Sequence, residues 1–362
     1  MRFLQISDVR IGADPESEKN WGRERASEIR DSLKRAVDRA SEAGCDLLLI
    51  AGGLFSHQPV TGELAEVNRL FLSVPALQIV IIAGRLDPLN KNAPARSFQW
   101  APNVHFAAED GLTRFSFPGI GTNVYAASYG ECGAESLPEL CREYREKYAG
   151  EENVAARLLL IPEATELDRS ADQLSAFSYI AAGGMEQHTE LIAGKAYCAG
   201  APEPLSMAEA GEHGYYIGDL SSATGRLIDI RFEAAAVASY VPLLVSLTPK
   251  TGREELLSLL RTEMEKRGKR NIYRLRISGR RSPDMDLDLG SLLREFRIAE
   301  LLEETVPQYD LSELFAEHPQ DMIGFYISRL QSEGTERSAV EEKAMYYGID
   351  ALLKTSGKTR KE

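Results

Sequence analysis

Short apolar runs alternate with amphipathic stretches over the first part of the chain. The runs MRFLQIS, DLLLIAGG and LQIVIIAG are each short enough for a buried strand. Between them, residues 22–43 place Ile29, Leu33 and Val37 at helical spacing, and residues 63–73 repeat that pattern. This βαβαβ order predicts a parallel sheet with helices packed against it.

The pattern changes after residue 103, where short strand-like segments follow one another with glycine-rich turns. They include NVHFA, NVYAASY, ARLLLI, YIAAGG and GYYIGDL, and one clear helix, at residues 137–148, interrupts them. A βαβ half followed by a strand-rich half predicts two sheets packed face to face, with helices outside. We expect this α/β domain to cover residues 1–238.

Two smaller regions follow the large domain. PLLVSLTP, a helical pattern over residues 253–267 and NIYRLRISG predict a β-α-β unit, so we expect residues 239–305 to form a separate small α/β domain. LSELFAEH, MIGFYISRL and AVEEKAMYYGIDALLK predict a helical segment over residues 306–355. The polar residues 356–362 predict a disordered tail.

Composition narrows the function classes. The formal net charge of −13 argues against strong autonomous binding to nucleic acid, which depends on neutralising phosphates. The apolar runs are too short for a membrane span, and the first residues do not resemble a leader peptide. The four cysteines lack CxxC spacing, so neither a zinc knuckle nor a disulfide framework is predicted. We expect a cytoplasmic protein with no membrane partner.

One stretch is strongly basic, although the net charge of the whole chain is negative. Residues 261–281 hold nine lysines and arginines against two glutamates. Such a stretch is either a solvated surface or a positive face for a polyanion. The nucleic-acid-binding candidates are Lys266, Arg267, Lys269, Arg270, Arg274, Arg276, Arg280 and Arg281.

The ends of the buried strands carry a series of loops that resembles a known family. The loops read SDVRIG, AGGLFSH, AGRLDPL, LLLIPEAT and YIAAGGMEQHTEL. Their series resembles the calcineurin-like metallophosphoesterases and, more closely, the SbcD-like DNA repair exonucleases. In that family the corresponding motifs are D-x-H, G-D-x-x-D, G-N-H-D, a lone His and G-H-x-H. The resemblance covers about residues 1–330.

The resemblance implies a fold, an activity and a partner. The fold is a four-layer metallophosphoesterase sandwich, in which helices flank two packed mixed sheets, with a small α/β capping domain and a helical C-terminal segment. The family activity is manganese-dependent hydrolysis of phosphodiesters in DNA, in which two metal ions clamp the substrate and generate a hydroxide. The family partner is an SbcC-like coiled-coil ATPase, which the C-terminal helices grip.

Position by position, this chain departs from the family's ligand set. Asp8 is retained, but the family's other ligand positions are occupied by Arg10, Gly53, Arg85, Gly184 and Glu186, and Leu86 replaces the histidine that would assist the leaving group. Pro162 and Glu163 stand in the lone-histidine loop, and none of the five histidines falls on a ligand position. We therefore expect no catalytic residue and no bound cofactor, and we predict a catalytically inactive pseudonuclease.

Two replacement sites remain open. Asp8, Asp87, Glu186 and His188, with Glu163 and His57 as further donors, are candidates for a rebuilt metal site. Arg10 and Arg85 are candidates for an anion pocket. For these arginines, ion pairs with Asp8 or Asp87 are favoured over the pocket.

Three functions follow in order of preference. The first is a pseudonuclease that scaffolds or regulates an SbcC-like ATPase in DNA repair. The second is a DNA exonuclease or phosphodiesterase with a rebuilt metal site. The third is a DNA-binding module that uses the capping domain. DNA contact through the partner and a homodimer stay open.

Overall fold

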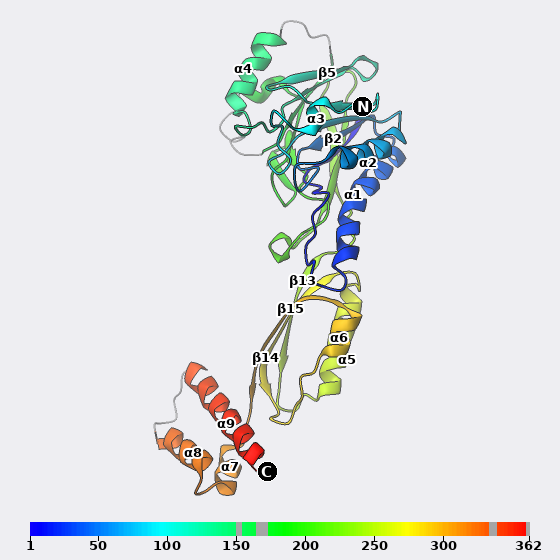
Figure 1. Ribbon diagram of the computed structural model, residues 1–362. Coiled ribbons are helices and arrows are strands. Elements are labelled where there is room, and N and C mark those ends of the chain that lie inside the picture. Colours follow the sequence, from blue (N-terminus) through cyan, green and yellow to red (C-terminus); the bar gives the residue numbers. More distant parts are fainter. Residues whose placement is uncertain (150–153, 164–172, 333–338, 360–362) are drawn as a thin grey trace. The chain divides into compact units, whose positions relative to one another are not determined.

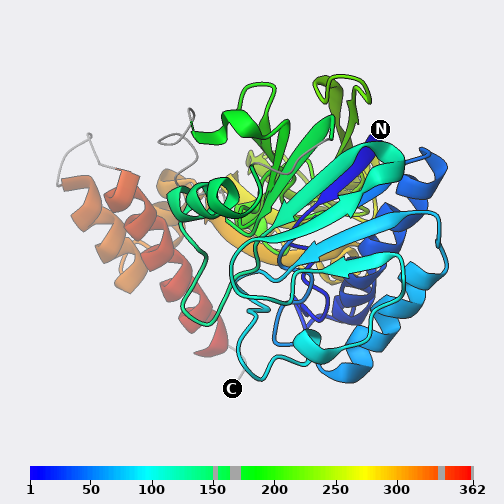
Figure 2. The same cartoon turned by 90° about the horizontal axis from the view of Figure 1, so that it is seen from above.

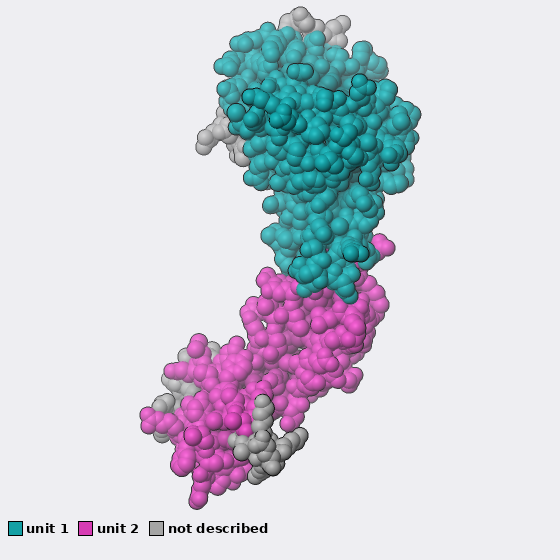
Figure 3. Space-filling model, in the orientation of Figure 1, with its two compact units in different colours: residues 1–240 teal, residues 241–362 magenta. Residues whose placement is uncertain are grey.

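The computed structural model describes residues 1–149, 154–163, 173–332 and 339–359 (Figure 1). It divides the chain into two compact units, Met1–Tyr240 and Val241–Glu362 (Figure 3). The division lies two residues after the end of the large domain expected from the sequence.

The first sheet of unit 1 combines parallel and antiparallel strands. Its order is β12-β11-β1-β2-β3-β4, in which β1 to β4 are parallel, β11 is antiparallel to β1, and β12 is antiparallel to β11. The strands are β1 (Arg2–Ile6), β2 (Leu47–Ala51), β3 (Gln78–Ile82), β4 (Val104–Phe106), β11 (Gly214–Leu220) and β12 (Leu227–Ala234). The βαβαβ pattern in the sequence thus forms the parallel centre of this sheet.

The second sheet of unit 1 is also mixed. Its order is β5-β6-β7-β8-β10-β9, and its two edge strands are antiparallel to their neighbours. The strands are β5 (Thr113–Phe117), β6 (Thr122–Ala126), β7 (Ala156–Ile161), β8 (Tyr179–Ala182), β9 (Thr189–Ile192) and β10 (Ala196–Cys198).

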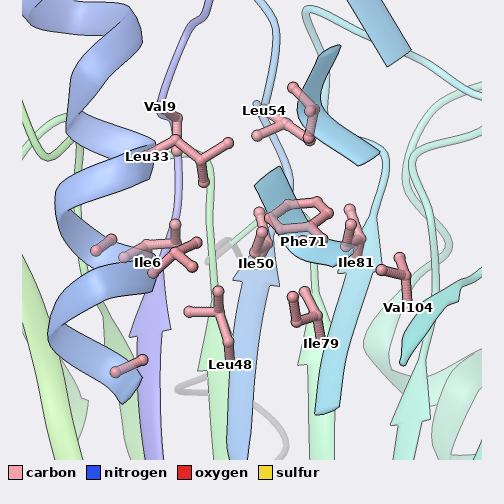
Figure 4. Packing of buried hydrophobic residues seen from close by; sticks show 14 of the residues in the cluster. Ile6, Val9, Leu33, Leu48, Ile50, Leu54, Phe71, Ile79, Ile81 and Val104 are labelled. Carbon is pink, nitrogen blue, oxygen red and sulfur yellow. The ribbon is translucent and has the colours of Figure 1, made fainter. Parts of the chain in front are cut away.

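Apolar clusters hold the layers of unit 1 together. One cluster packs α1 (Gly22–Glu42) and α2 (Thr61–Leu72) on the first sheet, with Leu33 and Phe71 near Ile50 (Figure 4). A second fills the space between the sheets, and a third packs α4 (Leu137–Lys147) on the second sheet. α1 and α2 lie on the opposite side of the sheets from α4 (Figures 1 and 2). The expectation of an α/β sandwich with two mixed sheets is confirmed.

Unit 2 begins with a three-stranded sheet of order β13-β14-β15. Its elements are β13 (Tyr240–Leu247), α5 (Arg253–Arg267), β14 (Ile272–Arg281), α6 (Gly290–Glu295) and β15 (Arg297–Pro307), and β14 and β15 are parallel. The inward residues of the strands, such as Leu243 and Leu275, pack on α5 and α6. The sequence pattern did not predict β15, which continues two residues into the segment expected to be helical.

Three helices complete unit 2. They are α7 (Leu311–Glu317), α8 (Met322–Ser332) and α9 (Ala339–Thr359), and their core includes Leu314, Ile323, Ile327, Met345, Tyr346 and Ile349. α9 continues to Thr359, past the expected end of the helical segment at 355, and residues 360–362 of the expected tail lie outside the described residues. Nowhere in the described chain is a helix long and apolar enough to cross a bilayer.

Candidate functional site

The loops that follow β1, β2, β3 and β8 meet at one edge of unit 1. We call residues 7–13, 52–57, 83–89 and 183–188 the loop cluster. Asp8 N–H donates to the Gly52 carbonyl and Arg10 N–H to the Gly53 carbonyl, both at 2.9 Å. These parallel strands end at the same edge of their sheets, so the loops that follow them lie together. The loops hold the positions that the sequence analysis compared with the motifs of the metallophosphoesterases.

The first loop holds two residues in an uncommon backbone conformation. Asp8 has a φ angle of 50° and Arg10 one of 57°, both in the left-handed region that favours glycine. Each such residue costs on the order of 1 kcal/mol and persists only where the surroundings enforce it. The backbone contacts to Gly52 and Gly53 supply that enforcement.

The Asp8 carboxylate is bonded by the protein itself. Its Oδ2 accepts the Gly184 N–H at 3.0 Å. Burial raises the pKa of Asp8 to about 6, although the nearby Arg10 guanidinium opposes that rise. A Cβ atom at Gly53 would lie 2.6 Å from Asp8 Oδ1. A bridging carboxylate at position 53 therefore requires Asp8 to move.

The Asp87 carboxylate connects two loops through hydrogen bonds. Its Oδ1 accepts the Gly84 N–H at 2.7 Å and its Oδ2 accepts the Phe55 N–H at 3.0 Å. The residue is buried, and burial raises its pKa to about 6. Both carboxylate oxygens thus hold the polypeptide backbone in place.

Arg10 forms a buried ion pair. Its Nη1 lies 2.9 Å from Oε1 of Glu209, and the two side chains are 10% and 8% exposed. Glu209 ends the short helix η4 (Met207–Glu209), and its Oε2 accepts the Leu205 N–H at 3.1 Å. An ion pair for Arg10 was expected, but its partner is Glu209 and neither Asp8 nor Asp87. The partner is 199 residues away in sequence, which no local pattern reveals.

The remaining residues at the motif positions of the 83–89 loop face solvent. Arg85 is exposed and makes no hydrogen bond or ion pair with any described residue, and Leu86 is also exposed. The two arginines therefore differ, because Arg10 is committed to Glu209 and Arg85 lies at the surface. They share no partner in the described chain, and the anion pocket considered from the sequence stays a prediction.

The two candidate histidines have partners elsewhere in the chain. The His188 ring stacks on Phe232, with ring centres 3.7 Å apart, and His57 Nε2 lies 3.1 Å from Glu63 Oε1. Glu186 is exposed, and Glu163 is half-buried just after β7. Among the described residues, no three His, Cys, Asp or Glu side chains gather closely enough to hold a metal ion. This donor set does not fit the two manganese ions that the resemblance implies.

The basic stretch lies in unit 2, and many of its side chains meet acidic partners. Arg274 pairs with Glu300, and Arg276 Nη2 lies 2.7 Å from Glu304 Oε2. Further polar contacts of the stretch include Lys269 with Glu265, Arg267 with Glu263, Arg261 with Glu295, and Arg281 with the Thr305 hydroxyl.

Seven basic residues of the stretch are exposed, namely Lys266, Arg267, Lys269, Arg270, Arg274, Arg276 and Arg280. Of these, Lys266 and Arg270 form no ion pair with any described residue. Glutamates on β15, a strand that the sequence pattern did not predict, pair with Arg274 and Arg276 of the expected positive face.

A second buried charge cluster was not among the sequence-based candidates. Arg25 and Glu203 have side chains that are 0% exposed, and Arg25 Nη1 lies 2.7 Å from Glu203 Oε2. Arg35 pairs with the same carboxylate, whose Oε1 also accepts the Val237 N–H at 2.8 Å. One sequence feature could have indicated that Arg25 is buried. It lies four residues before Ile29, on the apolar side of its helix.

Comparisons with known proteins do not identify a family for this chain. No family model matches the chain, and no curated protein matches it. Among solved structures, the chain is similar to the crystal structure of TT1561 of Thermus thermophilus, with 12% sequence identity and a TM-score of 0.38. The match covers 64% of this chain and 98% of that one. A TM-score this low supports no conclusion about family or function.

Proposed function

We propose that the protein is a non-catalytic, SbcD-like subunit that scaffolds or regulates an SbcC-like ATPase in DNA repair. In this role the sandwich serves as a structural body, and the C-terminal helices serve as the partner surface. The proposal combines the resemblance of the strand-end loops with the contacts inside the loop cluster.

The observation that carries the proposal is that Arg10, Asp8 and Asp87 of the loop cluster all have partners within the protein. Arg10 is paired with Glu209, and Asp87 binds two backbone N–H groups. Asp8 accepts the Gly184 N–H and lies in the space that a side chain at position 53 would need. A hydrolytic metal site needs several hard donors aimed at one open point. These contacts support a role in which the loops are held together without metal.

The C-terminal helices supply the partner surface in this proposal. Met322 and Phe325, three residues apart on α8, are both exposed. The opposite side of α8 already packs in the core of the helical segment through Ile323 and Ile327. An apolar pair on the outer side of a helix is the kind of surface that docks a partner helix.

The partner claim is tested by co-purifying the full chain with an SbcC-like ATPase from the same genome. We expect a stable complex that the double variant Met322→Ser/Phe325→Ser weakens by roughly tenfold or more. Leu244→Ser is the matched control, because Leu244 is an exposed apolar residue on β13, outside the helices. Absence of a complex, or equal loss with both variants, would contradict the assignment of this surface.

The two other functions make different predictions. A rebuilt nuclease hydrolyses DNA or a simple phosphodiester when manganese is added, whereas we expect no hydrolysis that depends on Asp8. A DNA-binding module loses affinity steeply as salt rises, because binding releases counterions from the phosphates. The ion pairs of Arg274 and Arg276 argue for weak direct binding and a shallow salt dependence.

A further inference from the structure

Strand β12 leaves a long edge of the first sheet in unit 1 unpaired. It is the outermost strand of its sheet, and no described strand pairs with its outer side. It has eight residues, whereas the edge strands β4, β5 and β9 have three, five and four. An unpaired edge presents a row of backbone N–H and C=O groups to any strand that can match it.

The regular part of β12 is bounded by a bulge. Asp229 pairs with Asp219 and Leu227 with Leu220, so Ile228 is an extra, exposed residue in the ladder. From Asp229 to Ala234, the strand follows β11 without interruption. This segment is therefore available for regular pairing on its outer side.

The hydrogen bonds to β11 show which backbone groups of β12 point outward. The ladder extends past the strand end to Ala235, whose N–H donates to the carbonyl of His213. Because the bonds of an antiparallel ladder alternate, residues 229, 231, 233 and 235 direct their N–H and C=O groups toward β11. Ile230, Phe232 and Ala234 direct theirs to the outer side, so they would bond a further strand.

Charges alternate along one face of this edge. Asp229, Arg231 and Glu233 point to the same side, because side chains in a strand repeat every two residues. The Arg231 and Asp229 side chains are 46% and 61% exposed, and their nearest charged atoms are 4.0 Å apart. A pair this exposed is weak, so Arg231 can bind a further carboxylate.

Antiparallel pairing of this segment with a second copy has few acceptable registers. Only outward-pointing residues can bond one another, so a two-fold axis passes through a residue and never between two. An axis at Arg231 sets arginine against arginine, and one at Glu233 sets glutamate against glutamate, both unfavourable for directly opposite residues. An axis at Ile230 brings the bulge at Ile228 into the ladder.

An axis at Phe232 avoids all three faults. It keeps the bulge outside the new ladder and bonds Phe232 to its own symmetry mate and Ile230 to Ala234. It also places Arg231 of each copy opposite Glu233 of the other copy, so two such pairs form. These charged residues form non-hydrogen-bonded pairs, in which side chains lie closest together.

We propose that two copies of this chain associate through β12, antiparallel about a two-fold axis at Phe232. On the charged face, Glu233 Oε1 lies 2.6 Å from Nε of Arg39 in its own chain. In the dimer, Glu233 also faces Arg231 of the second copy. The interface is isologous and closes the edge, so it stops at a dimer. The inference does not depend on the proposed function.

Sedimentation of the full chain at high micromolar concentration tests the association. We expect a dimer for the natural sequence. Arg231→Glu places glutamate against glutamate in both pairs, so we expect the dissociation constant to rise by roughly tenfold or more. Asp229→Arg is the matched control, because position 229 faces Ala235 of the second copy in this register, and we expect the dimer to persist.

A charge-swap mixture tests the register itself. The Arg231→Glu and Glu233→Arg variants should each be monomeric, because each sets like charges opposite one another. Their equimolar mixture should dimerise, because the two introduced residues then face each other with opposite charges, and natural Arg231 faces natural Glu233. Thermal melts check that Glu233→Arg still folds beside Arg39.

Each result of these experiments either supports or overturns the proposed dimer. A dimer that Arg231→Glu dissociates and the mixture restores supports the proposal. A monomeric natural chain, a dimer indifferent to Arg231→Glu, or a mixture of folded variants that stays monomeric would overturn it. If Glu233→Arg does not fold, the comparison of Arg231→Glu with Asp229→Arg decides between these outcomes.

Discussion

Both units place arginines against glutamates, but unit 1 buries its central pairs, whereas unit 2 leaves such pairs at the surface. Arg25 with Glu203 and Arg10 with Glu209 are buried in unit 1. On β14 of unit 2, the Arg276 side chain is 55% exposed, and Glu304, its partner on β15, is 37% exposed. The same two kinds of side chain therefore meet in very different surroundings.

The difference teaches what each kind of pair contributes. Removing one partner of a buried pair leaves an uncompensated charge away from water, which is strongly destabilising. An exposed pair gains little, because water and salt screen it and two long side chains lose freedom. The buried pairs therefore fix the loops and helix of unit 1, and the exposed pairs mainly neutralise the surface of unit 2.

The largest expected effect is at Glu203. Glu203→Gln removes the carboxylate that Arg25 and Arg35 share and leaves buried Arg25 with Glu28 as its remaining acidic partner. We expect the free energy of unfolding to fall by about 3 kcal/mol, measured by chemical denaturation.

A matched double variant separates lost charge pairing from lost packing. Arg25→Met/Glu203→Met should recover a large part of the stability, because no unpaired charge stays buried and Arg35, with a 33% exposed side chain, can reach water. A loss below about 1 kcal/mol for Glu203→Gln would mean that this pair behaves like an exposed one.

Arg10→Met should have the next largest effect. The change leaves buried Glu209 without its counter-charge, so we expect a loss of about 2 kcal/mol in denaturation experiments. Glu209→Gln should cost less, because Arg10 keeps the nearby charge of Asp8. Equal stability of Arg10→Met and the natural chain would show that this ion pair does not stabilise the loop cluster.

The third prediction concerns pH. Burial raises the pKa of Asp8 and of Asp87 from 3.8 to about 6, so the folded chain binds protons more tightly than the unfolded chain between these values. The contribution of these groups to stability is therefore full below the unfolded pKa and is lost as pH rises through about 6. Unfolding measured across this range should show a decline of roughly 1–3 kcal/mol that Asp87→Asn reduces. The same slope in that variant would rule out Asp87 as its source.

The smallest effect is expected at the surface of unit 2. Arg276→Ala removes the exposed pair with Glu304, and we expect the free energy of unfolding to change by no more than about 0.5 kcal/mol. A loss as large as that of Arg10→Met would erase the contrast between the two units.

Local patterns predict the layers of this protein better than its charge contacts. The helix expected over residues 22–43 forms as Gly22–Glu42, because its apolar spacing is regular. Strand β15 was not predicted, because glutamates interrupt its apolar alternation and much of it is only partly buried. Likewise, Glu209 could not be assigned to Arg10, because only the folded chain brings residues so distant in sequence together.

The most direct test of the central claim is calorimetric titration of the metal-stripped chain with manganese, with Asp8→Ala as the control. We predict no heat of binding that depends on Asp8 up to millimolar metal, because the carboxylates of the loop cluster already bind the backbone. Tight binding that disappears in Asp8→Ala would contradict this claim and would favour a rebuilt metal site.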